Sequence, residues 1–137
     1  MAMTLNWDNL EHLGDLQCDF ASQIHPMIQR EKQQPSKQND LSLFFNANIT
    51  NDWGDRASHQ FQSWRQNPDK MPSMGVFLEQ SIDYFNIDPD HNLIPVAMAA
   101  CLLGDIECNH PYHNNNHFSE VMSVLLKLSA VHNDLEI

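Results

Sequence analysis

The chain has 137 residues, three of them cysteine, and carries 18 Asp and Glu against 7 Lys and Arg, a formal charge of −11. This length is that of one domain with a core of its own. So acidic a surface repels a phosphate backbone, and no apolar run reaches the roughly 20 residues of a membrane span, so neither nucleic-acid binding nor membrane insertion is expected. The odd cysteine count and the lack of a secretory signal indicate reduced thiols and a cytoplasmic protein.

The hydrophobic periodicity is helical along most of the chain, which predicts an all-α helical bundle. A first amphipathic helix is expected over about 6–33, and Pro26 is expected to kink or divide it. A polar linker follows near 33–39, and Asp40 is positioned to cap a short element at 41–45. A helix over about 52–66 places four apolar side chains on one face, namely Trp53, Ala57, Phe61 and Trp64.

Three further helices are predicted, so that 1–137 forms a single α-helical domain or a fragment of one. Ser73 is expected to cap a helix with the apolar stripe Met74, Leu78, Ile82 and Phe85. The next helix ends near Gly104 and is expected to be lined by Leu93, Val96, Ala97, Ala100, Leu103 and Cys101. The last begins around Asn114 and is expected to bury Phe118, Val121, Leu125 and Leu128.

The most specific chemical signal is the segment 111–121, which reads PYHNNNHFSEV. His113 and His117 are one helical turn apart, so their imidazoles can approach a common point. Imidazole is the commonest metal ligand near neutral pH, although a metal centre needs three or four ligands. Asn114 stands at the expected helix start, where its side chain can cap the backbone amides of the next turn.

Five residues of this segment fit the pattern Y-H-N-x-x-H-x-x-x-V, namely Tyr112, His113, Asn114, His117 and Val121. The pattern resembles the first signature of the HD-domain metal-dependent phosphohydrolases, particularly the branch that contains cyclic-nucleotide phosphodiesterases. The departures from that branch are Phe118, where a small residue is common, and Ser119-Glu120. The all-α prediction agrees with the fold of this family.

The resemblance implies a function for the individual residues. His117 would be a metal ligand and His113 the general acid, with Tyr112 and Asn114 as supporting residues. The substrate would be a small phosphate ester such as a cyclic nucleotide, and the cofactor a divalent metal (Zn, Mg or Mn). Metal-activated water would attack the phosphoryl group while an imidazolium protonates the leaving alkoxide.

The rest of that ligand set is not found downstream. The resemblance implies a later His-Asp pair and a further Asp, but no His-Asp dipeptide follows His117. His132 is no substitute, because fifteen helical residues place it about 22 Å from His117. We therefore expect a truncated, N-terminal part of a larger phosphohydrolase, inactive on its own.

Two other interpretations stay open. Four possible zinc ligands lie within ten residues, namely Cys108, His110, His113 and His117. Alternatively, the histidines are incidental and the chain is a non-enzymatic helical interaction domain, which the acidic surface and the missing ligands favour. A His-Asp dipeptide in coding sequence beyond Ile137 would favour the hydrolase over this module.

Overall fold

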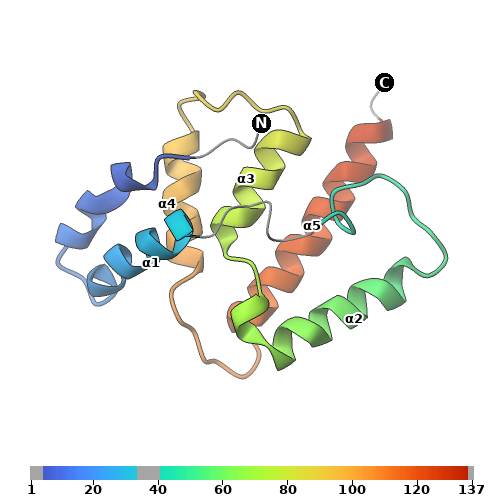
Figure 1. The fold of residues 1–137 in the computed structure, drawn as a ribbon, viewed down its shortest axis with the longest axis horizontal. Helices are drawn as coiled ribbons and strands as arrows, with labels where there is room; N and C mark the ends of the chain where they lie inside the picture. The colour runs from blue at the N-terminus through green and yellow to red at the C-terminus, as the bar shows by residue number, and fades with distance from the viewer. Residues whose placement is uncertain (1–4, 34–40, 136–137) are drawn as a thin grey trace. The chain divides into compact units, whose positions relative to one another are not determined.

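The structure, a computed structural model, describes residues 5–33 and 41–135 and is all-α, as the sequence predicts (Figure 1). In chain order the helices are the 3-10 helix η1 (Trp7–Asp15), α1 (Ala21–Gln33), α2 (Trp53–Gln66), the 3-10 helix η3 (Pro68–Lys70), α3 (Met74–Tyr84), α4 (Ile94–Gly104) and α5 (Asn115–Leu135). The described residues contain no β-strand, only an isolated bridge between Asn109 and Asn114. No helix within these ranges is long and apolar enough to cross a membrane.

The chain forms two compact units, each assembled from two separate stretches of sequence. The first unit, Met1–Asn39 with Pro72–Cys108, contains η1, α1, α3 and α4. The second, Asp40–Met71 with Asn109–Ile137, contains α2, η3 and α5. The linker predicted near 33–39 lies outside the described residues except for Gln33, and so does the predicted cap Asp40.

The first amphipathic stretch is two helices, so the prediction of one helix over 6–33 is wrong. η1 ends at Asp15, Leu16 has an extended backbone with ψ of 144°, and α1 begins at Ala21. The division falls well before Pro26, which lies inside α1. A physical reason is burial: a continuous helix leaves part of its stripe uncovered, whereas the two short helices share one apolar cluster that includes Trp7, Leu10, Ile24 and Ile28.

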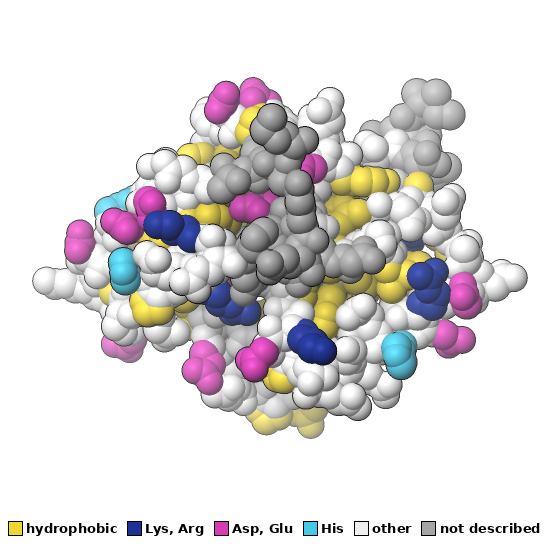
Figure 2. Space-filling model, in the orientation of Figure 1, with side chains coloured by type: hydrophobic (Ala, Val, Ile, Leu, Met, Phe, Trp, Pro, Cys, Tyr) yellow, Lys and Arg dark blue, Asp and Glu magenta, His cyan; other side chains and the backbone are white. Residues whose placement is uncertain are grey.

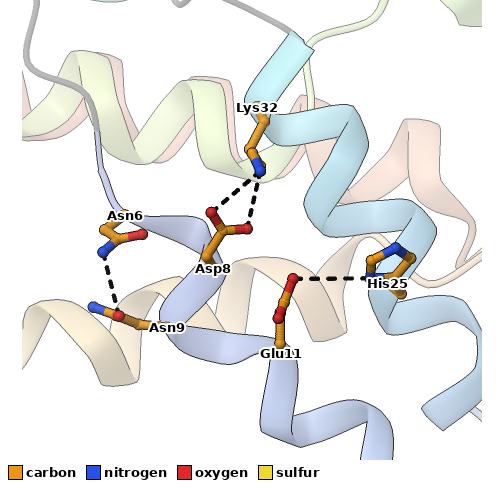
Figure 3. Close-up of polar contacts among 6 residues, drawn as sticks. All are labelled: Asn6, Asp8, Asn9, Glu11, His25 and Lys32. Atoms are coloured by element: carbon orange, nitrogen blue, oxygen red, sulfur yellow. Dashed lines mark hydrogen bonds and ion pairs between the residues drawn. The ribbon is translucent and has the colours of Figure 1, made fainter.

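Polar contacts also join η1 to α1 at their exposed edges (Figure 3). Lys32 Nζ donates to both carboxylate oxygens of Asp8 at 3.1 Å, and His25 Nδ1 lies 4.0 Å from Glu11. Exposed ion pairs of this kind contribute at most about 1 kcal/mol each. The apolar cluster, rather than these pairs, therefore accounts for the packing of α1 on η1.

A carboxylic acid lies on the buried face of α1. Ser73 Oγ donates to Glu31 Oε2 at 2.8 Å, and a side-chain hydrogen bond joins Glu31 to Asp105, which directly follows α4. Asp105 accepts the backbone N–H of Met74, the first residue of α3, at 3.0 and 3.1 Å. Ser73 also accepts the N–H of Val76, so its predicted role as the cap of α3 is confirmed. This polar cluster ties α1, α3 and α4 together.

The protonation of the cluster follows from its burial. The pKa of Glu31 is raised to about 8, mainly by burial. The negative charge of Asp105 also raises this pKa, and the hydrogen bond from Ser73 partly opposes the rise. Burial likewise raises the pKa of Asp105 and, with the charges of Asp105 and Glu31, raises that of the Cys101 thiol to about 12. Glu31 is therefore neutral near pH 7, and its carboxyl O–H donates a hydrogen bond to Asp105.

Substituting Glu31→Gln should remove a pH dependence of stability. The carboxyl titrates near 4.5 when unfolded and near 8 when folded, so its contribution to stability is complete below about pH 4.5. The free energy of unfolding then falls by up to about 1.4 kcal/mol per pH unit as the pH rises towards 8. Gln has no proton to lose, so urea denaturation at pH 5, 6.5 and 8 should show a flatter profile. An unaltered slope would contradict this, and Glu11→Gln, which is exposed, is the control.

α4 buries the face opposite to the one predicted. Ile94, Met98 and Leu102 are in the core, whereas four of the six predicted lining residues, namely Leu93, Val96, Ala100 and Leu103, are exposed. The prediction failed because α4 is apolar all the way round, and periodicity cannot choose a face on such a helix. The predicted end near Gly104 is confirmed.

The second unit is built on aromatic packing. α2 agrees with the helix predicted over 52–66, and its residues Ala57 and Trp64 are buried. Phe44, from the turns at 41–46, stacks on Phe61 with ring centroids 5.7 Å apart and lies 6.1 Å from Trp64. The predicted apolar face of α2 is thus covered by the segment before it.

α5 turns its more polar face inward. Its buried side chains are Ser119, Ser123, Leu126, Lys127 and Ala130. The predicted core residues Phe118, Val121, Leu125 and Leu128 are exposed, so that prediction is wrong. The serine side chains are small, and the Ser123 hydroxyl is satisfied within the helix, since its Oγ donates to the backbone oxygen of Ser119 at 2.7 Å.

The buried face of α5 includes a cation, Lys127, whose exposed fraction is only 3%. Its ammonium donates to the backbone oxygens of Asn46 and Asn48 at 2.6 Å and to Asn46 Oδ1 at 3.1 Å. It also lies 5.6 Å from the centroid of the Trp53 ring, a cation–π contact. Burial lowers the pKa of Lys127, and these contacts offset the cost of desolvation.

Lys127→Met should destabilise the second unit, although methionine is as apolar as the core. The change removes three donated hydrogen bonds, which leaves the backbone oxygens of Asn46 and Asn48 without the Lys127 donor in a part-buried setting. We expect a loss of about 1–3 kcal/mol, measured by chemical denaturation followed through tryptophan fluorescence. Lys70→Met, at an exposed position of the same unit, is the control, and equal stability of the two variants would rule out this role for Lys127.

Candidate functional site

Three histidines of the second unit lie in a row where the loop 109–114 enters α5. The ring centroids of His110 and His113 are 5.5 Å apart, and those of His113 and His117 are 5.6 Å apart. The isolated bridge between Asn109 and Asn114 closes the loop that carries the first two. His113 lies in this loop and His117 in the first turn of α5, and their rings meet edge to face at the helix start.

Asn114 fixes the first turn of α5. Its Oδ1 accepts the backbone N–H of His117, the third residue of the helix, at 3.0 Å, and its carbonyl accepts the N–H of Phe118 at 3.1 Å. The first of these is the hydrogen bond of an N-cap, the role predicted for this residue. The cap holds the backbone that carries His117.

His110 organises the loop rather than pointing at a ligand. Its Nδ1 accepts the backbone N–H groups of Tyr112 and His113 at 3.2 and 3.3 Å. With Nδ1 as acceptor, a neutral imidazole carries its proton on Nε2. Sequence reasoning named His110 as a possible zinc ligand and did not anticipate these hydrogen bonds to the loop backbone.

The four residues of the alternative zinc site are not gathered into one centre. Cys108 is the last residue of the first unit, whereas the three histidines belong to the second. Across 5–33 and 41–135, no group of three or more His, Cys, Asp or Glu side chains is arranged to hold a metal ion. His132 is on the same helix as His117 and fifteen residues further on. The other predicted site residue, Tyr112, is exposed.

An open apolar groove of about 480 Å³ runs along the outward face of α5. It is lined by Phe61, His117, Glu120, Val121, Val124, Leu125 and Leu128. The groove is not a closed pocket, and Leu128 is 61% exposed. At its polar edge, the Arg65 guanidinium donates to both oxygens of Glu120 at 2.7 and 2.8 Å. Sequence reasoning missed the groove because it assigned this stripe to the core.

The positively charged side chains of the visible face are dispersed. On the face shown in Figure 2, Lys and Arg side chains lie as separate groups and do not merge into one patch.

Comparisons with protein families, with curated proteins and with solved structures find no match to this chain. The functional assignment therefore depends on the site residues themselves.

Removing the cap should loosen the site. Asn114→Ala leaves the N–H of His117 without its side-chain acceptor, and loss of such a cap costs about 1 kcal/mol. We expect a lower thermal midpoint and faster amide exchange in the first turn of α5. Asn116→Ala, within the same turn, is the matched control. If both variants melt alike, Asn114 is not the cap.

Proposed function

We propose that this chain supplies His113 and His117 to the site of a metal-dependent phosphohydrolase that acts on a small phosphate ester, such as a cyclic nucleotide. The observation that carries the proposal is the pair of imidazoles, 5.6 Å apart at their centroids, at the start of a 21-residue helix. His117 takes the role of metal ligand and His113 that of general acid, as the resemblance of 112–121 implies.

The position of the pair suits a phosphate ester. The amino-terminal end of a helix carries a partial positive charge and outward N–H groups, which favour anionic oxygens. His113 is exposed in the loop just before this end, where its side chain is accessible to a substrate. An imidazolium there can give its proton to the alkoxide that leaves when a phosphodiester is cleaved. A divalent metal, when bound, would polarise the phosphoryl group and lower the pKa of a water molecule.

The described residues do not fit a complete metal centre, since no three donor side chains among them converge. The proposal therefore assigns one ligand to this chain and places the remaining donors in protein outside the described residues. His117 lines the apolar groove of α5, so protein packed there would lie beside this ligand. Turnover by residues 5–33 and 41–135 alone is not expected.

A helical interaction module is the second candidate, and the exposed stripe of α5 favours it. The side chains of Val121, Val124, Leu125 and Leu128 recur at helical spacing on one exposed face. A soluble monomer seldom exposes so continuous an apolar surface unless a partner covers it. On this assignment the histidines only shape the loop and the groove.

Activity measurements on the natural protein that contains this chain separate the two candidates. Hydrolysis of cyclic nucleotides and of bis(p-nitrophenyl) phosphate is measured with Mg²⁺, Mn²⁺ or Zn²⁺. We expect His113→Ala to lower kcat by about 10²- to 10⁴-fold, the usual contribution of a general acid. His117→Ala should abolish the metal-dependent rate.

The control is His59→Ala, an exposed histidine of α2 in the same unit. It should leave the rate unchanged. Full activity of the His117→Ala variant would show the phosphohydrolase assignment to be wrong. Absence of any metal-dependent hydrolysis by the natural protein would favour the interaction module.

A further inference from the structure

The face of α4 opposite its core residues, in the first unit, is a second apolar surface that is exposed among the described residues. Leu93 and Val96 are 61% and 62% exposed, Leu103 is 47% exposed, and Ala100 is exposed between them. Their spacing of three, four and three residues puts these side chains on one side of the helix. The core side chains Ile94, Met98 and Leu102 point the opposite way. α4 thus presents a stripe of the kind that packs against another helix.

The charged residues that flank α4 in the sequence are all acidic. α4 has no charged residue, while Asp88 and Asp90 precede it and Glu107 follows it. The stretches 1–39 and 72–108, which form the first unit, carry eleven Asp and Glu against three Lys and Arg, a formal charge of −8. One of these cations, Lys32, is paired with Asp8. The apolar stripe is therefore flanked in the sequence by acidic residues on both sides, within a unit of strong negative charge.

We propose that the outward face of α4 docks a basic amphipathic helix of another protein, with the apolar stripes in contact and Lys or Arg near each acidic end. Charge complementarity selects this occupant. A second copy of α4, parallel or antiparallel, would bring acidic ends together, and like charges across an interface are unfavourable. An anionic membrane surface would be repelled for the same reason.

The size of the face sets the character of the complex. α4 has 11 residues and is about 16 Å long at 1.5 Å per residue, which accommodates roughly three turns of a partner helix. A contact this small belongs to the transient class of interfaces. Binding should therefore be reversible, and sensitive to salt because acidic groups flank the stripe.

The test is titration of the 137-residue protein into a fluorescently labelled 18-residue peptide with Leu at heptad spacing and Lys at both ends. Two control peptides have the same Leu in scrambled order, or Glu in place of Lys. We expect the Lys peptide to bind at least tenfold more tightly than either control, and its affinity to fall as salt is raised. Equal binding of the scrambled or the Glu peptide would overturn the proposal.

Variants locate the binding face. Val96→Ser/Leu103→Ser should weaken binding at least tenfold, whereas Leu16→Ser/Ile87→Ser, at exposed positions of the same unit outside α4, should change it less than twofold. Asp88→Asn/Asp90→Asn, which leaves the apolar stripe intact, should weaken binding and flatten its salt dependence. Equal effects of the two double-Ser variants would refute docking on α4. So would a dimer in sedimentation that Val96→Ser/Leu103→Ser dissociates, because the occupant would then be a second copy.

Discussion

The arrangement of the first unit depends on a shared proton among buried carboxyl groups. Glu31 on α1 and Asp105 after α4 are joined by a hydrogen bond, and the two accept from Ser73 and Met74 at the start of α3. Two buried carboxylates would repel each other, so the cluster is stable only while one is neutral. Gly75 belongs to the same constraint, because a Cβ there would lie 2.7 Å from the Trp7 ring and collide with the Glu31 carboxyl. The protonation of Glu31 and the close approach of the Gly75 backbone to Trp7 and Glu31 thus depend on the same buried contact.

Local signals in the sequence predicted the helices of this protein well. Ser73 and Asn114 mark helix starts by chemistry that involves only neighbouring residues, and each start lies where it was expected. α4 also ends at Gly104 as expected, but without the left-handed backbone of a glycine cap. Glu31 follows Ile24 and Ile28 at spacings of four and three, so the stripe of α1 held a signal for a buried carboxyl. The break at 16–20 could not be predicted in this way, because it depends on how η1 and α1 share their core.

The choice of the buried face was not predictable for α4 or α5. On α4 every face is apolar, and which one is covered depends on η1, α1 and α3. On α5 the apolar stripe is exposed and the more polar face is buried, since Ser119, Ser123 and Lys127 face inward. Lys127 is bound by backbone oxygens roughly 80 residues earlier in the chain, an arrangement that no helical period encodes. The hydrophobic periodicity shows how much apolar surface a helix has. Which part of that surface is covered depends on the segments that pack against the helix in the folded protein.

The same reasoning connects the candidate site to the exposed stripe of α5. His113 in the loop and His117 in the first turn of α5 lie close together, and the hydrogen bonds of His110 follow from the fold of the same loop. His117 lies among the side chains of the apolar groove, so the residue that the resemblance marks as a ligand is on the face that lacks cover. Apolar protein packed in that groove would exclude water from the imidazole and lower the local dielectric, which strengthens any interaction with a charged ligand. The proposed role of His117 as a ligand therefore depends on what covers α5.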